Sequence, residues 1–233
     1  MKLHVLQHVP FEDAANIGVW ALEQGFTITT THLYLNESLP DPESIDMLVI
    51  MGGPMNIYQH DLYPWLVPEK QFIKAAIEAN CIVLGVCLGS QLICDALGGK
   101  VTRNEHTEIG WFPVTLTEAG QNPDSLLHVL GSPFEAFHWH GDTFSIPPGA
   151  IHLAFSEACA HQAFQYGDRV LGMQFHLDYS QQSIQTMVDN CADELIEGPY
   201  VQTDHEHLIE TDSAQSLQSH LVTLLSHLIT SAQ

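Results

Sequence analysis

Basic residues are scarce in this chain of 233 residues. Six lysines and arginines stand against 28 aspartates and glutamates, so the formal net charge is -22 with neutral histidines. A surface this acidic repels nucleic-acid phosphates and anionic lipid headgroups. We therefore expect no nucleic acid and no membrane among the partners. The acidic residues do not form blocks, which indicates a solvated acidic surface and not a disordered tail.

The sequence also lacks long hydrophobic runs. No apolar stretch approaches the roughly 18 to 20 residues that cross a bilayer, and residues 1–8 contain no hydrophobic core of a signal peptide. Five cysteines at irregular spacings predict neither a disulfide framework nor a C-x-x-C zinc site. These absences predict a soluble protein that is not exported and that resides in the cytoplasm.

One stretch organises the rest of the chain. The apolar run Cys81–Val86 predicts a buried strand, and residues 88–97 predict a helix. Cys87 lies between them, with Gly85 and Gly89 two residues away on either side. A strand, a G-x-C-x-G sequence and a helix form the pattern of a nucleophile elbow, in which a sharp turn exposes one reactive side chain. The alternative is a small core cysteine at a strand end.

Alternating strand-like and helical segments precede this stretch. They predict a parallel sheet with helices on both faces, because strand, helix and strand follow one another at short spacing. After residue 99 the strand-like runs are short and turn-separated, which indicates an antiparallel margin. The expected fold is thus α/β, a three-layer sandwich with a mostly parallel central sheet. The expected strands are 3–8, 26–35, 47–51, 81–86, 100–103, 109–116, 134–139, 151–155, 163–166 and 170–175, and the expected helices are 14–23, 68–79, 88–97 and 180–196.

We expect a single core domain over residues 1–197. Residues 198–233 then add a polar loop, up to about residue 213, and an amphipathic helix packed on the same domain. Leucines at helical spacing from Leu217 to Leu228 define that helix. It either covers the sheet or offers a surface to a partner.

Two further features could complete a cysteine-based site. Gly52 and Gly53 follow a predicted strand, where backbone amides can approach a ligand because no Cβ blocks them, although a simple turn also explains them. His176 ends another predicted strand, and Asp178 points to the same side of an extended chain. A cysteine nucleophile needs a base, and the base needs an acceptor that orients it. A single strand-end histidine would otherwise be structural.

Two histidine pairs invite a metal-site interpretation. They are His138-x-His140 and His205-Glu206-His207. Neither has a third and fourth ligand at a recognisable spacing, and the second is not an H-E-x-x-H motif. We therefore predict no metal site and no cofactor.

Six collinear motifs resemble those of the class I glutamine amidotransferases, especially stand-alone proteins similar to the glutaminase domain of GMP synthase. They occur in the family's order. The motifs are Met51–Met55, Pro64–Leu66, Leu84–Leu92, Glu108–Pro113, His138–Phe144 and Gly172–His176.

The resemblance implies a glutaminase-type amidohydrolase. Cys87 would attack the side-chain amide of glutamine and form a γ-glutamyl thioester, with His176 acting first as base and then as acid. The backbone amides of Gly53 and Leu88 would form the oxyanion hole. The resemblance assigns the amino-acid end of the substrate to Gly52, Gln91, His140 and Gly141.

The chain departs from the family in its third catalytic residue. The family has His-Pro-Glu where this sequence has His176-Leu177-Asp178. Aspartate is one methylene shorter, so Asp178 must lie closer to the imidazole or act through a water molecule. We interpret the change as tuning, because aspartate orients the histidine of triads in other folds. The alternative is a non-catalytic binding or regulatory relative.

The sequence also lacks an ATP-binding motif for ammonia transfer. It contains neither the S-G-G-x-D motif of the synthetase partner nor a P-loop. Either the ammonia passes to a separate synthetase subunit, or the enzyme is a free-standing γ-glutamyl peptide hydrolase. A cysteine hydrolase of different chemistry is disfavoured by the motifs at Gly52–Gly53 and His176.

Overall fold

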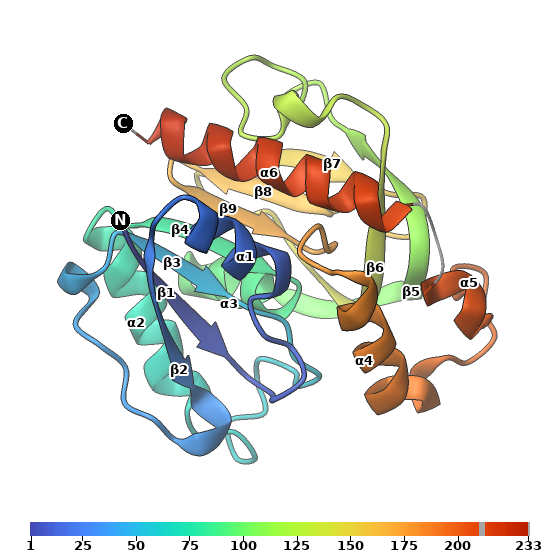
Figure 1. The fold of residues 1–233 in the computed structure, drawn as a ribbon, viewed down its shortest axis with the longest axis horizontal. Coiled ribbons are helices and arrows are strands. Elements are labelled where there is room, and N and C mark those ends of the chain that lie inside the picture. Colours follow the sequence, from blue (N-terminus) through green and yellow to red (C-terminus); the bar gives the residue numbers. More distant parts are fainter. Residues whose placement is uncertain (210–212, 233) are drawn as a thin grey trace.

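A computed structural model describes residues 1–209 and 213–232 of the protein. These residues form one mixed sheet with the strand order β2-β1-β3-β4-β9-β8-β7-β5-β6. Figure 1 shows the sheet running across the molecule. The strands are β1 (Lys2–Gln7), β2 (Thr27–His32), β3 (Met47–Ile50), β4 (Ile82–Val86), β5 (Val101–Leu116), β6 (Phe134–Phe144), β7 (Ile151–Phe155), β8 (Ala163–Tyr166) and β9 (Val170–Met173).

The parallel part of the sheet brings the predicted site residues to one edge. Strands β2, β1, β3, β4 and β9 pair in parallel, and β4 lies between β3 and β9. The carboxyl ends of these three central strands therefore meet at the same edge. Gly52 and Gly53 follow β3, Cys87 follows β4 and His176 follows β9.

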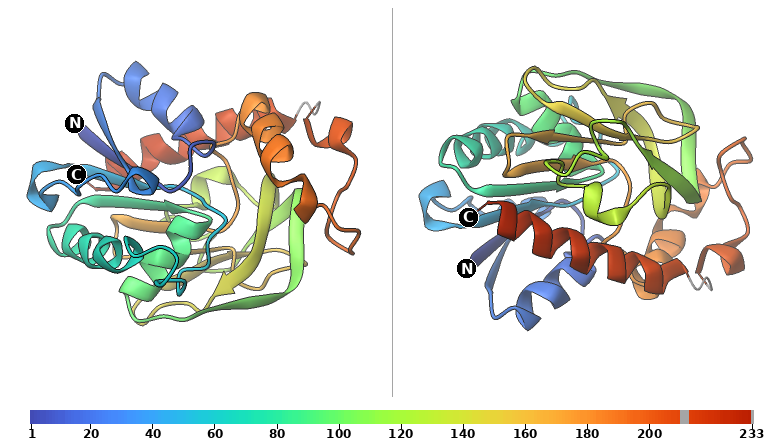
Figure 2. Two further views of the ribbon diagram at one scale, coloured as in Figure 1. Left: turned by 90° about the horizontal axis from the view of Figure 1, so that it is seen from below. Right: turned by 90° about the horizontal axis from the view of Figure 1, so that it is seen from above.

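Alternation along the central strands produces a core on each face of the sheet. In β3, Met47 and Val49 belong to the hydrophobic cluster that includes helix α1 (Ala15–Glu23) and helix α6 (Ser213–Ser231). Leu48 and Ile50 belong to the cluster that includes helix α2 (Leu66–Glu78) and helix α3 (Leu88–Ala96). This alternation follows from the period of two in a strand. Figure 2 shows the resulting three layers. The expected α/β fold is confirmed, although the sheet is mixed, with parallel pairing from β2 to β9 and antiparallel pairing from β9 to β6.

The C-terminal helix α6 packs on the sheet. Its leucines are fully buried, and they share one hydrophobic cluster with the strands. Figures 1 and 2 show α6 lying along the same face as α1. Of the two roles left open for this helix, covering the sheet is the one that this position favours.

The antiparallel part differs from the sequence expectation in its strand boundaries. Strands 100–103 and 109–116 were expected separately, but both belong to β5, whose register with β6 shifts between Arg103 and Glu108. The polar residues at this register shift resemble the sequence of a turn, although the strand continues through them. In the parallel part, strand β2 ends at His32, and residues 33–35 form a 3-10 turn where the expected strand continued.

The loop expected at residues 198–213 contains a short helix. Helix α4 (Gln181–Cys191) precedes it, and α5 (His205–Ile209) lies within it. The Asp204 carboxylate accepts hydrogen bonds from the backbone amides of Glu206 and His207, and Leu208 is fully buried. Capping and one apolar anchor therefore stabilise a helix that composition alone did not predict. Residues 210–212 of that expectation lie outside the described residues. No helix in the described ranges has both the length and the apolar character that crossing a membrane requires.

Close packing of α3 against the sheet depends on two glycines. A Cβ on Gly89 would overlap the backbone carbonyl of Ile50 in β3, and a Cβ on Gly85 would lie 2.6 Å from the carbonyl carbon of Gly89. Backbone atoms cannot move aside as a flexible side chain can. The helix that begins at residue 88 can therefore approach β3 and β4 only because both positions lack a side chain.

We predict that Gly89→Ala lowers the free energy of unfolding by about 1–3 kcal/mol or more, because the added methyl overpacks the interface between α3 and β3. Gly18→Ala is the matched control, since its Cβ would meet Ala14 at an ordinary 3.5 Å. In helix α1 the control should stabilise the protein by about 0.5–1 kcal/mol. Urea denaturation of the three proteins measures both effects. Equal stability of Gly89→Ala and the parent would contradict the packing argument.

Candidate functional site

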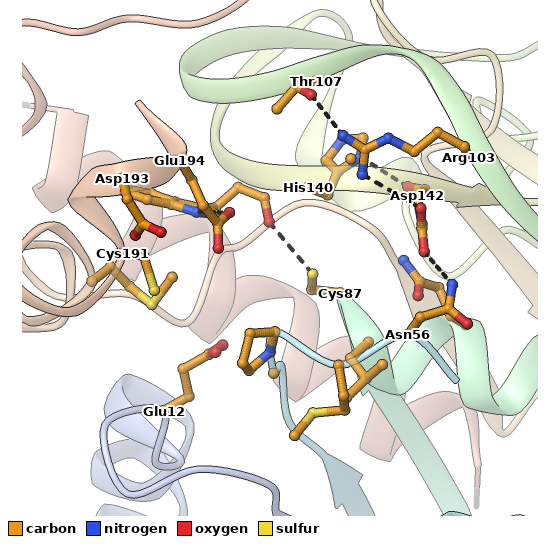
Figure 3. Close-up of a pocket in the computed structure, with 18 of the residues that line it drawn as sticks. Glu12, Asn56, Cys87, Arg103, Thr107, His140, Asp142, Cys191, Asp193 and Glu194 are labelled. Atoms are coloured by element: carbon orange, nitrogen blue, oxygen red, sulfur yellow. Dashed lines mark hydrogen bonds and ion pairs between the residues drawn. The ribbon is translucent and has the colours of Figure 1, made fainter. Parts of the chain in front are cut away.

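Cys87 occupies a strained turn between β4 and α3. Its backbone has φ of 50° and ψ of -108°, a conformation that residues with a side chain rarely adopt. Such strain persists only where the surroundings enforce it, and it is common at functional sites. The cysteine precedes the first turn of α3, and its side chain lines a cavity. Its Sγ lies 3.6 Å from the carbonyl oxygen of Trp139 (Figure 3).

His176 and Asp178 form a buried pair beside this cysteine. His176 Nδ1 lies 3.0 Å from Asp178 Oδ1, and both side chains are almost completely buried. The backbone of His176 pairs with that of Phe137 in β6, which fixes the position of the histidine. The Tyr179 ring stacks on the imidazole with a centroid separation of 4.0 Å. The shorter aspartate therefore reaches the imidazole directly, without a water molecule between them.

The environment changes the pKa values of the cysteine and the histidine. Burial raises the pKa of the Cys87 thiol, and the hydrogen bond and charge of His176 oppose this effect. Burial also acts to lower the pKa of His176, but the charge and hydrogen bond of Asp178, with a contribution from Cys87, outweigh burial and raise that pKa to about 10. The imidazole is thus a base strong enough to take the thiol proton. Because Nδ1 faces Asp178, Nε2 is the nitrogen left for Cys87.

The loop at Gly52–Gly53 is held by a buried histidine. His8 Nδ1 lies 2.9 Å from the carbonyl oxygen of Gly52, and His8 Nε2 lies 2.7 Å from Glu69 Oε1. Burial acts to lower the pKa of His8, but the Glu69 carboxylate and its hydrogen bond outweigh burial and raise it. A Cβ on Gly53 would lie 3.0 Å from the Leu88 side chain. Gly53 and Leu88, the residues expected to form the oxyanion hole, are therefore neighbours beside Cys87.

The residues assigned to substrate binding border the cavity in different ways. Gln91 lines the cavity, and its Nε2 donates to Gln174 Oε1 at 3.1 Å. Gln174 Nε2 in turn lies 3.5 Å from Cys87 Sγ. The backbones of His140 and Gly141 also border the cavity, but the His140 ring is buried and contacts the Asp142 carbonyl and Glu108. The ring nitrogens of His140 are therefore already engaged inside the protein, away from a substrate.

The cavity beside Cys87 has a volume of about 460 Å³ and carries charges of both signs. Arg103 borders it and lies 3.6 Å from the Asp142 carboxylate. Figure 3 shows Glu12 and Glu194 on one side of Cys87 and Arg103 on the other. An amino acid with a free ammonium and a free carboxylate has complementary charges.

Sequence reasoning missed three residues that contribute to this site. His8 was expected only as the last residue of the first strand, Glu12 received no role, and Gln174 was only part of a motif. His8 and Glu12 find their partners across long sequence separations, so no local pattern predicts them. The Glu12 carboxylate is buried, lines the cavity, and accepts a hydrogen bond of 3.3 Å from the Tyr179 hydroxyl. The one signal in the sequence that could have predicted Glu12 as a site residue is its position, since it is an acidic residue just after the first strand of a parallel sheet.

The chain is similar to known proteins over most of its length. The sequence profile of the family "Glutamine amidotransferase class-I" matches residues 21–195. The glutamine amidotransferase-like protein YfeJ of Salmonella typhimurium is 37% identical over 84% of this chain and 83% of its own length. One subunit of the glutamine-hydrolysing GMP synthase of Methanococcus maripaludis is 28% identical over 68% of this chain and 77% of its own length. The crystal structure of a glutamine amidotransferase from Methylobacillus flagellatus matches with a TM-score of 0.91 and 30% identity, over 100% of this chain and 95% of that one.

We predict that Glu12 makes stability fall as the pH rises. Burial, partly offset by the charge of His176, raises the pKa of Glu12 from 4.5 to about 6. A raised carboxyl pKa favours folding below the unfolded-state value, and this advantage is lost as the pH rises through 6. Between about pH 5 and pH 7.5, the parent should lose about 1 kcal/mol of stability relative to Glu12→Gln.

Thermal unfolding of the parent and Glu12→Gln at both pH values measures the change. Glu23→Gln, at an exposed glutamate of α1, is the control and should track the parent at each pH. A difference between Glu12→Gln and the parent that does not vary with pH would contradict the raised pKa.

Proposed function

Because the chain belongs to the class I glutamine amidotransferase family, we propose that it hydrolyses the side-chain amide of glutamine through a γ-glutamyl thioester on Cys87. The observation that supports this proposal most directly is the position of the strained Cys87 beside the buried pair His176–Asp178. A nucleophile, a base and an orienting carboxylate are the groups that this reaction needs.

The proposed reaction has two steps. The thiolate of Cys87 attacks the amide carbon, and His176, which has taken the thiol proton, gives a proton to the departing ammonia. Water then attacks the thioester carbon with His176 as base, and glutamate leaves as Cys87 regains its proton. The products are glutamate and ammonia, and no oxidant or reductant is needed.

The tetrahedral intermediate of each step carries a negative oxygen. We assign its stabilisation to the backbone amides of Gly53 and Leu88, the second of which belongs to the first turn of α3. Amides in the first turn of a helix have no partner within the helix, so they are available to an anion. Each such donor contributes about 3 kcal/mol to transition-state stabilisation in acyl-transfer enzymes. His8 supports this geometry, because it holds the Gly52 carbonyl that precedes the Gly53 amide.

The charges of the cavity support glutamine as the substrate. Arg103 can receive the α-carboxylate, because its pairing with Asp142 at 3.6 Å is weak and its side chain is mostly exposed. Glu12 and Glu194, which line the cavity near Cys87, can receive the α-ammonium group. A γ-glutamyl peptide carries the same two groups and the same reacting amide. It therefore remains the alternative substrate for the same chemistry.

The proposal also concerns where the released ammonia goes. One similar protein is named as one of the subunits of a glutamine-hydrolysing GMP synthase. That name supports transfer of ammonia from this chain to a separate synthetase subunit. Release of ammonia into water is the outcome for a free-standing hydrolase.

We predict that Cys87→Ala lowers turnover of glutamine by at least about 10³-fold, because it removes the thiol that forms the thioester. Ammonia release from glutamine, and amine release from a γ-glutamyl dipeptide, measure the effect and choose between the two substrates. Cys81→Ala is the matched control at the other end of β4, outside the cavity, and it should keep the parent's activity.

Two results would contradict the assignment of Cys87. One is equal turnover by Cys87→Ala and the parent. The other is covalent labelling of the parent by a glutamine-like electrophile at a different cysteine.

We also predict that Asp178→Asn lowers kcat by about 10²- to 10⁴-fold, because an amide neither fixes the imidazole tautomer nor stabilises the imidazolium. Asp178→Glu keeps the carboxylate and should retain more activity than Asp178→Asn. The kcat values of the parent and both variants measure the effect. A parent with almost no activity and a large gain in Asp178→Glu would instead indicate a non-catalytic relative.

A further inference from the structure

A second buried polar cluster lies behind the cavity wall. Glu108 in β5 and His138 and His140 in β6 are all buried, and Gln162 before β8 is buried beside them. Glu108 is directly opposite His140 in the antiparallel register, and His138 lies two residues along the same face of β6. The fold thus gathers two imidazoles and one carboxylate at one point.

The distances in this cluster suit metal coordination. Glu108 Oε2 lies 2.9 Å from His140 Nε2 and 3.4 Å from His138 Nδ1. One ligand atom from each of the three residues lies within 4.8 Å of the other two. Ligand atoms about 2.1 Å from a tetrahedral zinc ion are roughly 3.4 Å from one another.

The backbone fixes which nitrogen of each imidazole carries a hydrogen. His140 Nδ1 lies 3.1 Å from the Asp142 carbonyl oxygen, and His138 Nε2 lies 3.3 Å from the Phe112 carbonyl oxygen. A carbonyl only accepts, so these nitrogens donate. In a neutral ring the other nitrogen then presents a lone pair, and in both rings that nitrogen faces Glu108. A backbone carbonyl on the far nitrogen is also how proteins orient histidines that bind metals.

Two acceptors in the cluster have no partner among the described residues. They are Glu108 Oε1 and Gln162 Oε1. Gln162 Nε2 donates to Glu108 Oε2 at 2.6 Å and to Ser156 Oγ at 2.9 Å, and it lies 3.5 Å from His138 Nδ1. Buried acceptors without partners are costly, and a cation bound by the Glu108 carboxylate removes that cost for Glu108.

We propose that Glu108, His138 and His140 bind one divalent transition-metal ion, with zinc the ion favoured by two imidazoles and one carboxylate in a buried site. The ion joins β5 to β6 directly behind residues 140 and 141, which border the cavity. Trp139, between the two histidines, places its carbonyl 3.6 Å from Cys87 Sγ. The ion therefore holds the wall that faces the thiol and takes no part in the thioester chemistry.

Sequence analysis predicted no metal at His138-x-His140 because no further ligand stood at a recognisable spacing. Glu108 lies on the preceding strand, and only the register between β5 and β6 brings it to the histidines. The third ligand is therefore a product of the fold and not of a local motif.

Metal analysis of the untagged full chain tests the proposal. After dialysis against metal-free buffer, elemental analysis should find about one zinc or other transition-metal ion per chain. In chelator-treated protein, added Zn²⁺ should raise the melting temperature, and Co²⁺ should give the visible absorption of a protein-bound ion. Glu108→Gln should weaken Zn²⁺ binding by about 100-fold or more, measured by titration calorimetry. His205→Ala is the control at an exposed histidine of α5 and should bind as the parent does.

Two outcomes would overturn the proposal. One is a metal-free parent whose melting temperature does not respond to Zn²⁺ after chelation. This measurement uses only the parent, so it decides the matter even where Glu108→Gln fails to fold. The other is unchanged Zn²⁺ binding by a folded Glu108→Gln. Cys87→Ala should keep the metal while losing glutamine turnover, so failure of this proposal and failure of the proposed function are distinguishable.

Discussion

The close approach of helix α3 to strands β3 and β4 is the constraint on which the site depends. It is possible because Gly85 and Gly89 present no side chain to the backbones that pass beside them. The approach enforces the positive φ of Cys87, since the chain must leave β4 and enter α3 within one residue. The same geometry brings Cys87 and Leu88, the first residue of α3, to the lining of one cavity. The strained conformation of Cys87 thus follows from packing.

Charge at the site is organised around histidines paired with buried carboxylates. Contacts of 2.7 to 3.0 Å join His8 to Glu69, His140 to Glu108 and His176 to Asp178. A buried carboxylate needs a partner, and this chain has six lysines and arginines against fifteen histidines. Histidine also offers a second nitrogen, which can contact a backbone carbonyl, a thiol or a metal ion. The scarcity of basic residues is therefore consistent with an interior in which histidine is the main partner of acids.

Much of the fold and part of the site follow from local sequence. The elbow at Cys87 and the parallel strands around it are recognisable because buried strands, glycines and helix-forming residues occur in a fixed order. Asp178 was predicted beside His176 because residues two apart in an extended chain share a side. The single strand β5 was predicted as two, since the polar residues between Arg103 and Glu108 resemble a turn. Local composition does not distinguish a register shift within a strand from the end of that strand.

The residues that local sequence could not assign are those whose partners lie far away in the sequence. His8 meets Gly52, Glu12 meets Tyr179, and Glu108 meets His140. The family profile covers residues 21–195 and so includes Cys87, His176 and Asp178, whereas His8 and Glu12 precede that range. In the proposed reaction, the three residues inside the range supply the nucleophile, the base and its orienting acid. His8 holds the Gly52 carbonyl and Glu12 lines the cavity, and under the proposed function such features can change while the chemistry is kept. For the proposed reaction, selection among γ-glutamyl substrates is therefore to be sought in the contacts made by the segment after β1, more than in the elbow.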